Sequence, residues 1–240
     1  MKPWIRNTLL VLGTIIFALG AILFVVSRPL PAQASALAAM QSDAAVSISN
    51  TDSSIVFRPA KPNGRGLIFY QGARVDPQAY AVTLRAIAEA GYLVIEPKMP
   101  LNFAVFNAAA ADSIILSNPT IDWAIAGHSL GGAMACSYAN SSGKIKKLIF
   151  WAAYCDKSFD LSNSPIAVTS ISGSLDGLAT PQKVANTKVF APSSTKYVVI
   201  NGMNHAQFGD YGEQSGDNPS KISVEDANRQ IIAATLTALR

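Results

Sequence analysis

Charged side chains are scarce in this sequence. Only 14% of its 240 residues are Asp, Glu, Lys or Arg, whereas 50% are hydrophobic. This balance excludes an intrinsically disordered chain, because disorder goes with low hydrophobicity and high charge. The sequence also contains no internal repeat, no low-complexity tract and no long insertion that would form a separate cap domain. Its length and apolar content predict one folded domain with a sizeable core.

An excess of positive charge is also lacking outside the N-terminus. The formal net charge of +4 includes Lys2, Arg6 and Arg28, and from residue 31 onward 16 basic residues face 15 acidic ones. The sequence therefore has no basic stripe of the kind that binds nucleic acid. We expect no nucleic-acid partner.

Charge is missing altogether from residues 9–26, and Thr8 and Ser27 extend the uncharged segment to residues 8–27. As a helix rising about 1.5 Å per residue, this segment would span roughly 30 Å, the thickness of a bilayer core. Lys2 and Arg6 precede it, and basic residues favour the cytoplasmic side. We therefore predict a transmembrane helix at residues 8–27, with residues 1–7 in the cytoplasm and the rest of the protein membrane-anchored outside it.

A cleaved signal peptide is the alternative interpretation, because Ala32-Gln33-Ala34 resembles a cleavage site and the secreted protein would then begin near Ala34. A retained anchor is favoured, since the apolar region of a signal peptide usually runs only about 7 to 15 residues. Both interpretations place the rest of the chain outside the cytoplasm. Residues 28–44, which are rich in Pro, Ala and Ser, are predicted to be a tether to a domain at residues 45–240.

Cysteine is rare, and Cys136 and Cys155 are the two in the chain. They could pair in an exported protein. However, they fall on different predicted elements, whose Cβ atoms would have to approach within roughly 4 Å. We interpret them as two small buried apolar residues, with a disulfide as the alternative.

Short apolar segments alternate with helical patterns from residue 45 onward. Residues 45–49 and 54–57 predict two partly exposed strands that form a hairpin. Buried strands are then predicted at residues 66–70, 92–96, 121–126, 147–151, 166–171 and 196–200, with helices near residues 80–90 and 103–116, from residue 130, and from residue 223 to the end. Apolar strands separated by helices are typical of a parallel sheet covered on both faces, so the predicted fold class is α/β.

One motif in this pattern carries chemistry. Gly127-His128-Ser129-Leu130-Gly131 lies directly between the predicted strand at 121–126 and a predicted helix. A Gly-x-Ser-x-Gly motif in a strand–turn–helix context is a nucleophile elbow, a strained turn that projects the serine above the sheet edge. Small residues at its glycine positions let strand, turn and helix pack closely. The motif predicts Ser129 as a nucleophile.

Histidine is as rare as cysteine, which limits the choice of a base. A serine hydroxyl is a weak nucleophile and is most often activated by His. His128 adjoins Ser129 within the turn, so its side chain should diverge from the serine. His205 follows the strand at 196–200 and emerges at the sheet edge where the base is needed. We therefore predict His205 as the base.

The base requires a carboxylate that fixes its tautomer. Asp176 follows the strand at 166–171 and gives the chain order Ser, acid, His that is typical of this arrangement. Asp156 and Asp160, after the preceding strand, are the alternatives. We predict Asp176 as the third member of the triad.

These segments resemble the α/β-hydrolase superfamily, and within it the small single-domain members without a cap. The resemblance spans roughly residues 55–240. It is carried by Tyr70-Gln71-Gly72-Ala73, the elbow with Gly131-Gly132, Ser174-Leu175-Asp176-Gly177, and residues 204–211. It implies a hydrolase of small-molecule carboxylic esters or related acyl compounds that works through an acyl-serine intermediate without a cofactor. We expect a monomer.

The resemblance also implies an oxyanion hole made by the backbone N–H groups of Ala73 and Leu130. The sequence differs from lipases and many esterases in lacking a His-Gly-Gly-Gly run before the loop that contains Ala73, which argues against esters of bulky alcohols. An acyltransferase with the same triad, or a non-catalytic binding domain on the same fold, are the alternative functions.

Acidic residues among the glycines of residues 209–221 offer a different possibility. Asp210, Glu213 and Asp217 could ligate calcium, but their spacing matches no known calcium loop. We interpret this segment as a solvated loop at the rim of the site and expect no metal.

Overall fold

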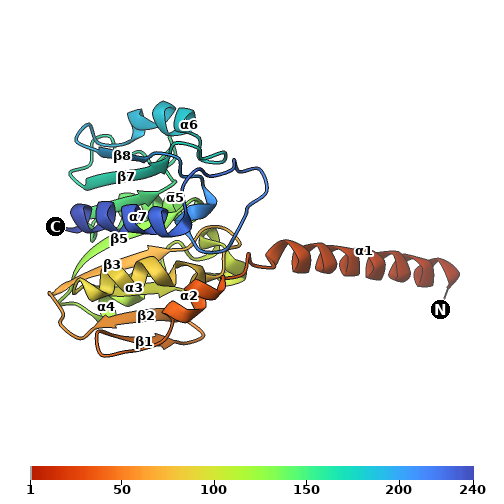
Figure 1. Ribbon diagram of the computed structural model, residues 1–240. Coiled ribbons are helices and arrows are strands. Elements are labelled where there is room, and N and C mark those ends of the chain that lie inside the picture. Colours follow the sequence, from red (N-terminus) through yellow and green to blue (C-terminus); the bar gives the residue numbers. More distant parts are fainter. Residues whose placement is uncertain (1) are drawn as a thin grey trace.

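The fold is built on one central sheet. The computed structural model describes residues 2–240, except for the side chains at positions 19 and 21–27. Within these residues eight strands join in the order β1-β2-β4-β3-β5-β6-β7-β8 (Figure 1). The strands are β1 (Val46–Asn50), β2 (Ser54–Pro59), β3 (Arg65–Tyr70), β4 (Leu93–Pro97), β5 (Asp122–His128), β6 (Lys147–Trp151), β7 (Ala167–Gly173) and β8 (Lys196–Ile200).

The pairing of the strands follows their hydrophobic pattern. Strands β3 to β8 are parallel to one another. Strands β1 and β2 form an antiparallel hairpin, and β2 also pairs with β4 in antiparallel direction. Strands β4 and β5 are almost wholly buried, as strands with helices on both faces must be. The predicted α/β class and the leading hairpin are confirmed.

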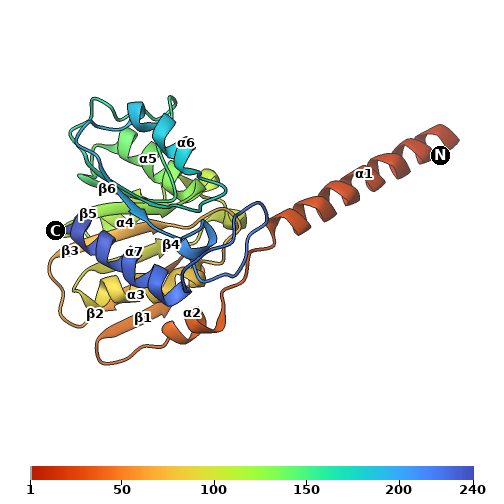
Figure 2. The same cartoon turned by 45° about the horizontal axis from the view of Figure 1, so that its top comes forward.

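Helices cover both faces of the sheet. One face packs against α3 (Ala81–Glu89) and α7 (Val224–Leu239), and the other against α4 (Ala111–Ser117) and α5 (Leu130–Ser142) (Figures 1 and 2). The smaller helices are α2 (Ala34–Ala39) and α6 (Pro181–Asn186), with 3-10 turns η1 (Pro77–Tyr80), η2 (Pro100–Asn102), η3 (Ala104–Asn107), η4 (Lys188–Phe190) and η5 (Ala206–Phe208). Helix α7 begins where the sequence predicts, because the Ser223 hydroxyl accepts a hydrogen bond from the N–H of Asp226.

The helix predicted at residues 103–116 is divided into η3 and α4. The buried side chain of Tyr70 explains the break. Its hydroxyl donates to the carbonyl of Ala108 and accepts from the N–H of Ala111, at 2.8 and 3.0 Å. In a continuous helix these two backbone groups would form hydrogen bonds with other backbone groups of the same helix. Here a side chain from β3 takes the place of those partners.

Helix α1 (Pro3–Ser27) projects away from the sheet in both views (Figures 1 and 2). Among the residues whose side chains the structure describes, none forms a helix with the length and apolarity needed to cross a membrane. The predicted membrane segment includes positions 19 and 21–27, whose side chains lie outside the described part of the structure.

Residues 28–44, predicted to be a tether, lie against the domain. Leu30 forms a parallel bridge with Val75, in the loop that follows β3. The N–H of Gln33 donates to the carbonyl of Asp210 at 2.8 Å, and Ala36 is fully buried in α2. A composition rich in small residues and proline resembles that of a flexible linker, but here small side chains allow the segment to pack closely.

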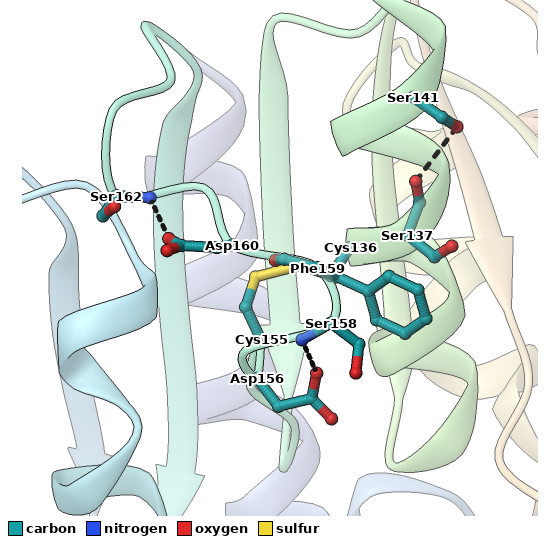
Figure 3. The surroundings of a disulfide bond; sticks show 9 residues. All are labelled: Cys136, Ser137, Ser141, Cys155, Asp156, Ser158, Phe159, Asp160 and Ser162. Atoms are coloured by element: carbon teal, nitrogen blue, oxygen red, sulfur yellow. Dashed lines mark hydrogen bonds between the residues drawn. A yellow bond between two sulfur atoms is a disulfide. The ribbon is translucent and has the colours of Figure 1, made fainter.

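Cys136 and Cys155 form a disulfide, so the interpretation as two unpaired residues was wrong. The bond joins α5 to the segment that follows β6, with the two Cα atoms 5.9 Å apart (Figure 3). The approach is possible because the helix packs tightly on this strand end: a Cβ added to Gly132 would lie 2.3 Å from the Cβ of Ala153. Spacing along the sequence does not reveal this proximity.

Candidate active site

Ser129 occupies a strained turn between β5 and α5. Its backbone has φ 52° and ψ −123°, in a region that L-residues rarely adopt. Its N–H donates to the carbonyl of Trp151 at 2.9 Å, and its carbonyl accepts from the N–H of Ala133 at 3.1 Å. Such a conformation costs about 1 to 3 kcal/mol and persists only where the surroundings impose it. The elbow predicted from the sequence has the expected strand–turn–helix context.

The surrounding glycines impose this conformation by close packing. A Cβ on Gly127 would lie 2.5 Å from the carbonyl carbon of Gly131. A Cβ on Gly131 would lie 2.2 and 2.3 Å from the carbonyl oxygens of Gln71 and Tyr70, at the end of β3. No side chain fits at such distances, so these positions require glycine. Backbone of β3 and of α5 therefore packs directly against the turn.

His205 and Asp176 form a buried pair. The Nδ1 of His205 lies 2.8 Å from Oδ2 of Asp176, and each residue is only 1% exposed. The other carboxylate oxygen, Oδ1, accepts the N–H groups of Leu178 and Ala179 at 2.8 and 2.7 Å. With all these bonds the carboxylate has a fixed orientation, and the imidazole presents its Nε2 away from it.

That Nε2 is the nitrogen a base would use. It is buried and has no hydrogen-bond partner among the described residues. His205 and Ser129 line the same cavity of about 250 Å³. The other lining residues are mostly small and apolar: Leu130, Ala133, Ala152, Ala153, Tyr154, Leu178 and Ala179. The structure therefore brings the predicted nucleophile and base to one cavity, with Asp176 behind the base.

The alternative acids lie elsewhere. Asp156 and Asp160 are exposed in the segment after β6. Each carboxylate accepts a backbone N–H two residues further on, from Ser158 and Ser162 respectively (Figure 3). These are local turn contacts, so the arrangement favours Asp176 over both alternatives.

The predicted oxyanion residues flank the elbow. Leu130 follows Ser129 and lines the same cavity. Ala73 lies in the loop after β3, and β3 pairs with β5 in a register that sets Tyr70 opposite Gly127. The loop therefore starts beside the elbow. The assignment of these two N–H groups to an oxyanion hole stays a prediction.

A second histidine lies beside His205, and the sequence did not indicate its role. The rings of His128 and His205 have centroids 4.6 Å apart. The Tyr80 hydroxyl accepts the N–H of Gly72 at 2.9 Å and is hydrogen-bonded to Nδ1 of His128, also at 2.9 Å. Burial, and secondarily the proximity of His205, lower the pKa of His128 well below its usual value. His128 is therefore neutral beside His205.

The acidic loop at residues 209–221 makes contacts that the sequence did not predict. Among the described residues no three His, Cys, Asp or Glu side chains lie close enough to hold a metal ion. Instead, the carboxylate of Asp217 accepts backbone N–H groups, including those of Gly177 and Ala206. No sequence pattern distinguished Asp217 from the other acidic residues of the loop.

A strained serine between strand and helix, facing a buried Asp–His pair across a parallel sheet edge, is the arrangement of an α/β hydrolase. The sequence pattern of the Alpha/beta hydrolase family matches residues 66–229, so the chain belongs to this family. Comparison with curated proteins gives no match.

Solved structures of similar fold include three hydrolases. The esterase domain of a Rhodothermus marinus protein is 12% identical, with a TM-score of 0.60 over 81% of this chain and 99% of that one. An alpha-beta serine hydrolase homologue from Coxiella burnetii is 14% identical, with a TM-score of 0.54 over 80% and 98%. A cold-adapted esterase from an Arctic intertidal metagenomic library is 12% identical, with a TM-score of 0.52 over 81% and 93%. At these identities the likeness shows the fold alone.

Proposed function

We propose that this protein is a serine hydrolase of carboxylic esters or related acyl compounds, with Ser129 as nucleophile, His205 as base and Asp176 as the residue that orients the base. One observation carries the proposal: the Nδ1 of His205 is bound by a buried carboxylate at 2.8 Å, which leaves Nε2 for the cavity shared with the strained Ser129.

The reaction follows from this geometry. Ser129 Oγ attacks the acyl carbon while Nε2 of His205 takes the hydroxyl proton, and the resulting imidazolium is stabilised by Asp176. Collapse of the tetrahedral intermediate expels the alcohol, which receives that proton, and leaves an acyl group on Ser129. Water then attacks the acyl-serine, again with His205 as base; the acid is released and the proton passes from His205 to Ser129 Oγ. The N–H groups of Ala73 and Leu130 would stabilise the oxyanion, each by roughly 3 kcal/mol.

The size of the cavity supports a short acyl group. Its volume of about 250 Å³ is smaller than the roughly 300 to 1,000 Å³ of sites for drug-sized ligands, and four of its nine lining residues are alanine. We expect acetyl to butyryl esters of a common chromogenic alcohol to turn over faster than octanoyl esters. Leu178→Ala, which enlarges the cavity, should shift the preference toward longer chains, and an unchanged preference would argue against this acyl site.

A covalent probe tests the proposed nucleophile. A fluorophosphonate should label the folded wild-type protein at Ser129, and labelling should disappear in Ser129→Ala. Ser158→Ala, at an exposed serine, is the matched control and should label like the wild type. Absence of labelling in folded wild-type protein would favour a non-catalytic binding domain.

We also propose that the catalytic domain lies outside the cytoplasm, anchored through residues 8–27. Two features support this location: Lys2 and Arg6 before the uncharged segment, and the Cys136–Cys155 disulfide, since disulfides form and persist mainly in oxidising compartments. Protease added to intact cells, or to cells whose outer membrane has been opened, should digest the domain. Protection until the inner membrane is lysed would contradict this location, and a freely soluble mature protein would contradict the anchor.

A further inference from the structure

Asp217 connects the two loops that carry the acid and the base, although it lies in neither. Its Oδ1 accepts the N–H of Gly177 at 2.9 Å, and its Oδ2 accepts the N–H of Ala206 at 2.8 Å. Gly177 directly follows Asp176, and Ala206 directly follows His205. One carboxylate therefore binds the residue next to the acid with one oxygen and the residue next to the base with the other.

The next residue, Asn218, makes a similar pair of contacts, with the residue before the acid and the residue before the base. The side-chain amide of Asn218 donates to the carbonyl of Leu175 at 3.1 Å, and the carbonyl of Asn218 accepts the side-chain amide of Asn204 at 2.7 Å. Leu175 precedes Asp176, and Asn204 precedes His205. The acid and the base are thus each held from both sides by a segment of two residues.

The fit between this segment and the acid loop is close. A Cβ added to Gly177 would lie 2.8 Å from the carbonyl oxygen of Gly216 and 2.9 Å from the backbone nitrogen of Asn218. The chain therefore reaches the loop at backbone distance, and only glycine at position 177 allows the carboxylate of Asp217 to bind there.

The strength of these contacts is suited to positioning. A hydrogen bond from a backbone N–H to a carboxylate is charge-assisted and roughly twice as strong as a neutral one. Both oxygens of Asp217 are used, and Oδ1 also accepts the N–H of Asn218, which fixes the carboxylate's own orientation. Asp217 does not line the cavity shared by Ser129 and His205.

We propose that Asp217 is a positioning residue that sets the separation and orientation of Asp176 and His205 by binding the backbone next to each. It does so without touching substrate. Misplacement of a catalytic group by about 1 Å lowers turnover roughly 100-fold. Removal of this carboxylate should therefore reduce kcat far more than it changes substrate binding. The inference rests on the proposed function.

The test compares Asp217→Ala and Asp217→Asn with the wild-type protein on one short-chain activated ester. Active sites are counted by fluorophosphonate titration, so that unfolded protein does not lower the apparent kcat. We expect Asp217→Ala to lose about 10- to 100-fold in kcat, with KM changed less than about threefold. Asp217→Asn keeps one acceptor oxygen and should fall between Ala and wild type.

A spectroscopic measurement separates positioning from stability. The proton between Nδ1 of His205 and Asp176 should give a downfield NMR resonance in the wild-type protein, absent from His205→Ala. In Asp217→Ala this resonance should shift or broaden. The matched control is Asp160→Ala, because Asp160 also accepts a backbone N–H in a turn but lies on an exposed loop. It should leave kcat and the resonance unchanged.

The outcomes are distinguishable. If wild-type protein shows neither labelling nor turnover, the proposed function fails, and the resonance still reports on whether Asp217 positions the pair. If wild-type protein is active and the Asp217 variants keep wild-type kcat per active site and an unchanged resonance, the inference is overturned, even if they melt at a lower temperature. If Asp217→Ala does not fold, Asp217→Asn decides by the same two measurements.

Discussion

Two halves of the candidate site are held in place by different forces. The nucleophile half consists of the loops after β3 and β5, residues 71–75 and 127–132, and the acid–base half consists of the loops after β7 and β8, residues 174–179 and 201–209. In the nucleophile half, Gly127 and Gly131 allow backbone to contact backbone with no room for a side chain. In the acid–base half, side-chain carboxylates and amides bind backbone groups of neighbouring loops.

The difference matches what each half must do. The serine has to be held in an unfavourable conformation, and repulsion between packed atoms is stiff enough to hold it there. The base has to change its charge during the reaction, which requires fixed polar groups around it. Steric packing thus holds the proposed nucleophile, and hydrogen bonding holds the proposed acid and base.

The largest effect is expected where the two halves meet. Ser129→Ala, His205→Ala and the double variant should each lower kcat by about four to six orders of magnitude and leave nearly the same residual activity. The two side chains act as one unit, so removal of either removes the attack. The measurement is turnover of one activated ester, with circular dichroism to show that each variant is folded. Losses that multiply in the double variant would contradict a shared role.

The next-largest effect is expected from a substitution in the acid–base half alone. Asp176→Asn should lower kcat by about 10⁴-fold while the fold is retained, because an amide favours the wrong tautomer of His205. Asp156→Asn is the matched control at an exposed carboxylate and should have little effect. Kinetics of both variants on the same ester decide the assignment. The opposite ranking would move the acid to the segment after β6.

Added side-chain volume in the nucleophile half should destabilise the fold. Gly131→Ala places a methyl group 2.2 Å from the carbonyl oxygen of Gln71, so we expect a loss of about 3 kcal/mol or more in the free energy of unfolding. Gly143→Ala is the comparison, because Gly143 has open space around it but a φ of +62°. It should lose only about 1 kcal/mol from backbone strain. Urea denaturation of both variants measures the difference, and equal losses would show that crowding at the elbow is relieved elsewhere.

The smallest effect concerns Glu96, a charged residue type that is buried in β4 among apolar side chains, near the nucleophile half. Neither of its carboxylate oxygens has a hydrogen-bond partner among the described residues. Burial raises the pKa of Glu96 well above its usual value, and the nearby charge of Asp76 adds to this rise. The folded state therefore holds this proton to higher pH than the unfolded state does.

The sign of the pH dependence follows. Glu96 favours folding fully below about pH 4.5, the pKa of an unburied Glu, and this contribution is lost as pH rises toward the folded-state pKa. The loss is about 1.4 kcal/mol for each unit of pKa difference. Glu96→Gln should therefore raise the melting temperature at pH 7 and leave it nearly unchanged at pH 4. A variant that is less stable at pH 7 would show that the charged form is stabilised in the fold.

Local patterns in the sequence predicted much of this structure. Apolar segments bounded by helical patterns located every strand to within two residues at each end, because burial on both faces demands continuous hydrophobicity. The Gly-x-Ser-x-Gly motif located the elbow, since its geometry depends on adjacent residues. The scarcity of histidine pointed to His205, which the structure places beside Asp176.

Other features depended on contacts between distant segments. The helix predicted at residues 103–116 is interrupted because Tyr70, from β3, bonds its backbone. The Cys136–Cys155 disulfide forms because α5 packs closely on the end of β6. In both cases the deciding partner is not adjacent in sequence, so local pattern and spacing carried no signal.

The sequence by itself determined the α/β class, the order of its elements and the turn that holds Ser129, because hydrophobic period and glycine spacing act over a few residues. The tertiary structure alone decided the neutral His128 beside His205, the docking of residues 28–44, and the binding of Asp217 next to both Asp176 and His205. The docking of residues 28–44 and the contacts of Asp217 depend on which backbone groups are left unbonded once the sheet and helices have formed. The polar group that binds an unbonded backbone group comes from a distant part of the chain. Its position in the sequence therefore does not show which backbone group it will bind.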